Sequence, residues 1–116
     1  MRENFIPCKE SIILNELGFD RACLGWYETD KSALSVGESW RSGQYSIKAP
    51  LYQQAFRWFR EKHNLNSFII DSKSYNWYFN INDMIKDDLV SEILYFKTYE
   101  EAELECLKKL IEITKK

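Results

Sequence analysis

The sequence predicts an α+β fold in which two amphipathic helices cover one face of an antiparallel sheet of three or more strands. Three stretches support this prediction: residues 50–63, 75–81 and 98–114. The first and last repeat apolar residues at helical spacing, whereas the middle one alternates apolar and polar residues as a half-buried strand does. Sequential strands between two helices favour an antiparallel meander with both helices on one face.

We expect a single domain over residues 1–116, with an N-terminal region, 1–49, joined to an α-β-β-β-α core, 50–116. A chain of 116 residues should bury roughly two-thirds of its unfolded surface, which is enough for a core of its own. Four Trp, seven Tyr and seven Phe argue against a disordered chain.

The N-terminal region predicts a short helix, a strand and an irregular hairpin. The helix covers 7–19, because Pro7 suits a first turn and Gly18 can take the left-handed conformation that ends a helix. Residues 22–29 are typical of a strand. The stretch that follows, 29–49, lacks a helical period, and we expect only weak strands in it, at 33–36 and 44–48.

Trp40 and Arg41 lie in the middle of this irregular stretch. Long loops of this kind are either functional or mobile. An aromatic side chain beside a cation is typical of protein contact sites, so the pair is a candidate for protein interaction. The alternative is that Trp40 packs on the core.

The helix over 50–63 should begin with Pro50, because the missing N–H of proline is not needed in a first turn. Trp58 should lie at the margin of its inner face. That inner face is expected to hold Leu51, Tyr52, Ala55, Phe56, Phe59 and His63. The outer face is expected to hold Arg57, Arg60, Glu61 and Lys62.

Strands are predicted at 66–72, 75–81 and 93–97, with an acidic, irregular connection at 82–91. Side chains of a strand point alternately to its two faces. The face toward the helices should therefore hold Tyr75, Trp77, Phe79 and Ile81. The outer face should hold Asn76, Tyr78 and Asn80.

The C-terminal helix should begin at Thr98, which forms a capping box with Glu101. Glutamates fill its first turns and lysines its end, as the helix dipole favours. A broad apolar stripe predicts cover on more than one side. The stripe consists of Tyr99, Ala102, Cys106, Leu110 and Ile113, widened by Leu104, Leu107 and Ile111.

Composition excludes several function classes. A net charge of -2 does not attract the chain to phosphates or anionic membranes. No apolar run approaches the ~20 residues of a membrane span, and the first residues lack the apolar segment of a signal peptide. An odd number of cysteines (Cys8, Cys23 and Cys106) without a C-x-x-C motif favours a reducing, cytoplasmic location with free, buried thiols.

The sequence offers little for catalysis. His63, the single histidine, could pair with a cysteine in a nucleophile site, but no family signature flanks the cysteines, and a packing role at the helix end is the alternative. Asp83, Asp87 and Asp88 lack the spacing of a calcium loop and favour a solvated turn. Phosphate-loop and zinc-ligand spacings are absent. We therefore expect no enzymatic activity, cofactor or metal.

The order helix, three strands, helix resembles that of double-stranded RNA-binding domains over roughly the last 65 residues. Those domains need a lysine cluster where their last helix begins. Here that helix begins with Glu100, Glu101 and Glu103. Carboxylates repel phosphates, so the resemblance supports the topology and argues against binding of duplex RNA by the usual surface.

Residues 5–28, 49–65 and 97–113 resemble a family of small proteins of Bacteroides-type phages, prophages and mobile elements, most specifically over 50–65. The resemblance implies an accessory protein of a mobile element. It implies no activity and assigns no functional residue.

Two hypotheses for function follow. The first is a non-enzymatic protein that binds an unidentified protein partner through Trp40, Arg41 and Tyr78. It makes no membrane contact, and the sequence does not determine its oligomeric state. The second is a nucleic-acid-binding module, in which Tyr78 on the outer sheet face stacks on single-stranded bases. Its basic patch would be Arg57, Arg60 and Lys62.

Overall fold

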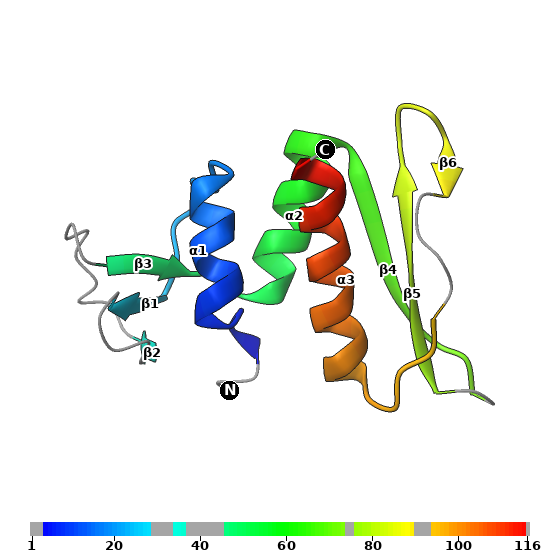
Figure 1. The fold of residues 1–116 in the computed structure, drawn as a ribbon, viewed down its shortest axis with the longest axis horizontal. Helices are drawn as coiled ribbons and strands as arrows, with labels where there is room; N and C mark the ends of the chain where they lie inside the picture. Colours follow the sequence, from blue (N-terminus) through cyan, green and yellow to red (C-terminus); the bar gives the residue numbers. More distant parts are fainter. Residues whose placement is uncertain (1–3, 29–33, 37–45, 74–75, 90–93, 116) are drawn as a thin grey trace. The chain divides into compact units, whose positions relative to one another are not determined.

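The structure is a computed structural model, which describes residues 4–28, 34–36, 46–73, 76–89 and 94–115. The chain divides into two compact units, Met1–Ala55 and Phe56–Lys116, and each is described by itself (Figure 1). The fold class is α+β, as predicted. That the two units form one domain stays a prediction.

The first unit contains helix α1 (Cys8–Glu16) and strands β1 (Gly25–Glu28), β2 (Leu34–Val36) and β3 (Ser46–Ala49). The strands form an antiparallel sheet in the order β2-β1-β3, which confirms the weak strands expected in the irregular stretch. Helix α1 packs against β3. One hydrophobic cluster of this unit contains the buried residues Phe5, Tyr27 and Ala49.

Gly18 ends α1 as predicted. Its φ of 100° lies in the left-handed region, which a residue without Cβ adopts at low cost. The amide of Gly18 donates to Asn15 O and that of Phe19 donates to Leu14 O, at 3.2 and 3.0 Å. These two bonds make a Schellman motif, and the Phe19 side chain that follows Gly18 is buried.

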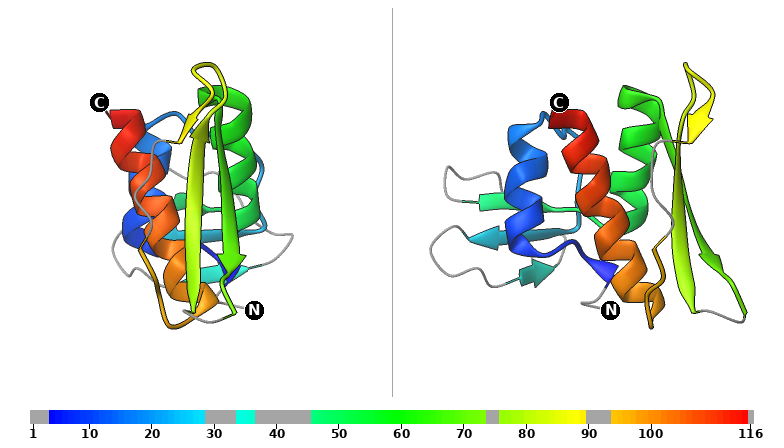
Figure 2. Two further views of the ribbon diagram at one scale, coloured as in Figure 1. Left: turned by 90° about the vertical axis from the view of Figure 1, so that its right-hand side faces the viewer. Right: turned by 45° about the vertical axis from the view of Figure 1, so that its right-hand side comes forward.

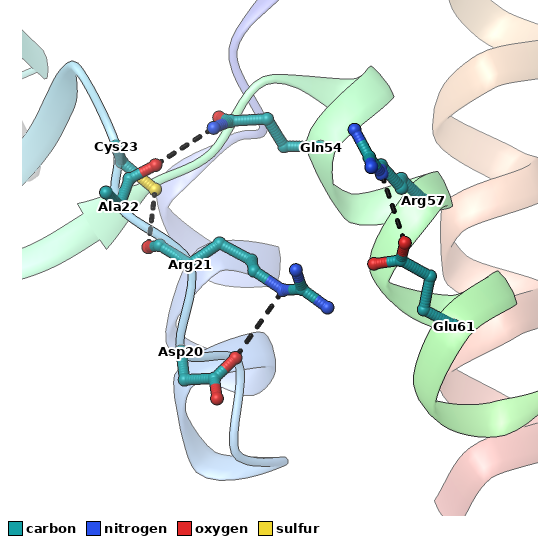
Figure 3. Close-up of polar contacts among 7 residues, drawn as sticks. All are labelled: Asp20, Arg21, Ala22, Cys23, Gln54, Arg57 and Glu61. Atoms are coloured by element: carbon teal, nitrogen blue, oxygen red, sulfur yellow. Dashed lines mark hydrogen bonds and ion pairs between the residues drawn. The ribbon is translucent and has the colours of Figure 1, made fainter.

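Helix α2 (Tyr52–His63) begins two residues later than predicted, because Pro50 and Leu51 are engaged elsewhere. The carbonyl of Pro50 accepts from the Ile6 amide at 2.9 Å, in a β-bridge that joins Phe5 and Leu51. The Leu51 amide donates to Gln54 Oε1 at 2.9 Å, so Gln54 caps the first turn. Gln54 Nε2 also donates to Ala22 O at 2.9 Å (Figure 3).

Helix α2 ends at His63, the residue predicted as its last. Asn64 ends the helix with a φ of 57°, and Leu65 after it is buried. Phe59 is fully buried. Trp58 is also buried, so its placement at the margin was wrong: its ring packs edge-on against Phe59 and His63, with centroids 5.0 and 4.8 Å apart.

The second unit contains strands β4 (Leu65–Asp71), β5 (Trp77–Asp83) and β6 (Asp88–Leu89), paired antiparallel in the order β4-β5-β6. The strand predicted at 93–97 is wrong in its extent. Of its described residues only Phe96 pairs, through two hydrogen bonds of 2.8 and 2.7 Å with Trp77.

The third strand of the sheet is β6, which lies within the connection 82–91 that was predicted to be irregular. Asp83 Oδ1 accepts from the amides of Ile85 and Lys86 at 3.0 and 3.1 Å, and Asp87 has a φ of 57°. An aspartate that binds its own following amides favours a tight turn. The chain therefore returns to β5 at Asp88, earlier than the apolar pattern suggested.

Helix α3 (Tyr99–Lys115) and the part of α2 from Phe56 onward lie on the same face of the β4–β5 ladder (Figures 1 and 2). Thr98 caps α3, because its Oγ1 accepts from the Glu101 amide at 3.1 Å. α3 packs on both β4 and β5. Its buried apolar residues are Ala102, Cys106, Leu107, Leu110 and Ile111.

Glu103, which belongs to the acidic start predicted for α3, is buried. The pKa of the Glu103 carboxyl is raised, because the effect of burial exceeds that of the hydrogen bond from the Tyr99 hydroxyl, which lowers the pKa. Tyr99 is the residue one turn earlier on the same helix, so this pairing gives the buried carboxyl a donor.

Candidate protein-interaction surface

The two faces of the β4–β5 ladder have different surroundings. Phe79 and Ile81 on β5 are buried on the face that carries the helices, as predicted. The Phe79 ring stacks on Phe96, with centroids 5.9 Å apart, and Trp77 packs edge-on against Tyr99 at 5.2 Å. The inner face is therefore part of the core of this unit.

The outer face is also apolar, yet it is open. The antiparallel register pairs Phe68 with Asn80 and Ile70 with Tyr78, so these four side chains share the outer face. Phe68 is 46% exposed. Ile70 and Tyr78 are half-buried between their neighbours.

Two residues beyond the ladder extend the outer face. The Tyr95 ring packs edge-on against Tyr78, with centroids 5.7 Å apart, and Tyr95 is 52% exposed. Leu89 on β6 pairs with Asn82 and is 52% exposed. We call the set Phe68, Ile70, Tyr78, Leu89 and Tyr95 the outer aromatic face. None of the five carries a charge.

The residues predicted for protein interaction are only partly placed by the structure. Tyr78 lies on the outer aromatic face, as the alternation predicted. Trp40 and Arg41 lie outside the described residues. Whether they act with Tyr78 stays untested.

The basic patch proposed for nucleic acid does not join Tyr78. Arg57, Arg60 and Lys62 are exposed on α2, and the part of α2 from Phe56 onward lies on the inner face of the sheet (Figure 2). The strand register places Tyr78 on the outer face. Arg57 Nε also lies 3.2 Å from Glu61 Oε2 on the next turn (Figure 3). An anion partner on the same helix lowers the local positive potential that would attract phosphate.

Sequence reasoning missed four members of the outer aromatic face: Phe68, Ile70, Leu89 and Tyr95. Phe68 and Ile70 alternate with Ser67 and Ile69, and this period, applied to β4, would have placed them beside Tyr78. Leu89 lies in the connection 82–91 that was predicted to be irregular, so no strand face was predicted for it. Tyr95 has no such signal, because Phe96 beside it pairs through one bridge only.

Two of the three cysteines, Cys23 and Cys106, do not resemble nucleophiles. Burial raises the pKa of the Cys106 thiol to about 12 and that of the Cys23 thiol to about 11. Cys23 Sγ lies 3.5 Å from the Arg21 carbonyl oxygen (Figure 3). A thiolate is the reactive form, so both thiols are protonated and unreactive near neutral pH. All three cysteines are free.

His63 is a packing residue in the described structure. Its ring contacts Trp58 and Phe59, and Nε2 is buried with no hydrogen-bond partner among the described residues. Burial lowers the pKa of His63 below its usual 6.5. The folded protein therefore holds the neutral imidazole more strongly than the unfolded chain does.

This lowered pKa predicts a pH dependence of stability. The unfolded chain binds a proton at His63 more readily than the folded protein, so the free energy of unfolding should decrease as pH falls through about 6.5 toward the folded pKa. Urea unfolding at several pH values gives the free energy of unfolding of the wild-type protein and of His63→Gln, and hence the difference between the two free energies. That difference should change as pH falls below about 6.5. A difference that stays constant over this pH range would contradict a lowered pKa of His63.

Within the described ranges, no group of three or more His, Cys, Asp or Glu side chains could hold a metal ion. Asp83 in the β5–β6 turn caps backbone amides instead, since its Oδ1 accepts two of them. Among the same residues no helix is both long enough and apolar enough to cross a membrane.

Comparison of the chain with protein-family models, with curated proteins and with solved structures finds no match.

Proposed function

We propose that the chain is a non-enzymatic protein-interaction protein that binds a protein partner through its outer aromatic face. The observation that supports this proposal most is the exposure of large apolar side chains on a sheet whose other face is already covered. Phe68 and Tyr95 are 46% and 52% exposed, although they belong to one contiguous surface with Tyr78. Exposed apolar patches of this kind are typical of protein interaction sites.

The composition of the face fits a protein partner better than an ionic ligand. Aromatic residues are enriched in interface centres, and charged residues are depleted there. Burying one large apolar side chain contributes about 1.5–3 kcal/mol, so a few such residues can support specific binding. Asn66, Asn80 and Asn82 occupy the same side of the ladder and give the face polar groups between its apolar ones.

We further propose that the protein is an accessory protein of a phage or mobile element. The support for this context is the sequence resemblance over residues 5–28, 49–65 and 97–113. It names no partner, so the partner must be found by experiment.

The test compares three proteins for binding to one purified partner. A tagged wild-type chain is used to capture candidates, and each candidate is then purified and titrated by calorimetry. Phe68→Asp/Tyr95→Asp should bind roughly 30-fold more weakly or worse, because both anchors are replaced by carboxylates. Ile85→Asp is the matched control, since Ile85 is 77% exposed in the β5–β6 turn and outside the face.

Equal affinity of the partner for the wild-type protein and the double variant would contradict the proposal. Circular dichroism and thermal unfolding check that all three proteins are folded. Salt-dependent binding of single-stranded DNA or RNA, lost in Arg57→Glu/Arg60→Glu and retained in Phe68→Asp/Tyr95→Asp, would instead favour the nucleic-acid hypothesis.

A further inference from the structure

The outer edge of β4 is paired with no strand in the described part of the chain. We propose that a second copy of this chain pairs antiparallel along this edge, with a two-fold axis at Phe68, and so joins two sheets into one. The proposal concerns the edge of the sheet and goes beyond the proposed function, which concerns its outer face.

The hydrogen bonds of the β4–β5 ladder show which backbone N–H and C=O groups of β4 point away from β5, toward the outer edge of the sheet. At one end the Met84 amide donates to Asn64 O at 2.8 Å, and at the other the Ser72 amide donates to Asn76 O at 2.9 Å. In an antiparallel ladder, bonded and non-bonded residues alternate. The backbone groups of Asn66, Phe68 and Ile70 therefore point toward β5. Those of the alternate residues, Leu65, Ser67, Ile69 and Asp71, point away from it.

No described strand occupies this outer edge. β5 is the one strand paired with β4 in the described part of the chain, and β4 ends the order β4-β5-β6 (Figure 2). The ladder with β5 runs through all seven β4 residues without a bulge. A regular strand with a free row of donors and acceptors is a template for another strand.

The sequence of β4 lacks the features that normally keep an edge strand from pairing. Proteins protect such edges with lysine, proline, inward charges or bulges. Residues 65–70 read LNSFII and contain no charge, no proline and no glycine. Asp71, the last residue of β4, is its single charged residue.

A register centred on Phe68 makes the strand complementary to itself. It places Ser67 opposite Ile69 of the second copy, and Leu65 opposite Asp71, so that all four outward-pointing residues pair. Four such pairs form about eight backbone hydrogen bonds, and any shift by two residues loses a pair. The two Asp71 carboxylates then lie at opposite ends, about 20 Å apart along the ladder, and do not repel each other closely.

The same register brings the two Phe68 side chains together on the outer face. They form a non-hydrogen-bonded pair across the axis, in which facing side chains approach most closely. Aromatic cross-strand pairs stabilise a sheet. The dimer would thus extend the outer aromatic face of one copy into that of the other.

The experiment is sedimentation equilibrium of four proteins: wild type, Phe68→Lys, Phe68→Glu and Leu89→Lys. The wild-type chain should form a dimer. Each charged Phe68 variant should dimerise at least 10-fold more weakly, because two like charges meet at the axis. An equimolar mixture of the Lys and Glu variants at position 68 should regain a dimer. Leu89→Lys is the control, since it adds the same charge to the same face on β6, away from the edge.

A wild-type chain that stays monomeric up to about 1 mM would overturn the proposal. So would a dimer that Phe68→Lys leaves unchanged, or a mixture of the two variants that gains nothing. A monomer that still binds a protein partner through the outer aromatic face would overturn the dimer alone and leave the proposed function standing.

Discussion

Replacing Phe79 by alanine should lower the free energy of unfolding by about 3–5 kcal/mol. The Phe79 ring is buried between β5 and the helices and stacks on Phe96, with an interplanar angle of 13°. Alanine would remove that ring and leave a cavity in close-packed surroundings. Urea unfolding followed by tryptophan fluorescence measures the loss.

Phe68→Ala is the matched control, because it removes the same side chain from the opposite face of the same ladder. Phe68 is 46% exposed, so this variant should lose less than about 1 kcal/mol in dilute solution. Equal losses for the two variants would mean that both faces are covered, and the outer aromatic face would then not exist as described.

Leu110→Ala should cost about 2–5 kcal/mol. Leu110 is fully buried in the middle of α3, where the helix packs on β4 and β5. The loss includes the transfer free energy of the deleted atoms and the cavity they leave. Chemical unfolding of the purified variant is again the measurement.

Leu94→Ala serves as its control, since Leu94 is 54% exposed just before the bridge at Phe96. It should change stability by less than about 1 kcal/mol. A loss below roughly 0.5 kcal/mol for Leu110→Ala would indicate that the apolar stripe of α3 faces solvent or a partner.

The regular elements could be predicted because their patterns are local. Helix α3 combines a cap at Thr98 with a broad apolar stripe, and both are visible in the sequence. β5 alternates so regularly that Phe79 and Ile81 were placed on the correct face. Gly18 and Asn64 mark helix ends through positive φ, which few residue types adopt readily.

The failures lie where distant contacts or turn geometry decide. Pro50 was expected inside α2, but its carbonyl pairs with Ile6, some forty residues away in the sequence. The position of β6 depends on the turn that Asp83 caps, and Trp58 is covered although helical spacing put it at a margin. No short-range pattern contains such information.

The candidate surface could be predicted only in part for the same reason. Tyr78 follows from the alternation within one strand, whereas Phe68 and Ile70 join it only through the register between β4 and β5. Tyr95 joins through a ring contact from a segment outside any strand. A surface assembled from four segments has no complete signature in any one of them.

One face of the β4–β5 sheet is core, and the other is an open aromatic surface. Hydroxyl-radical footprinting at low protein concentration tests this claim most directly, because it reports the solvent access of individual rings. Phe68 and Tyr95 should be oxidised much faster than Phe79 and Phe96. Equal protection of Phe68 and Phe79 in the monomer would contradict the account.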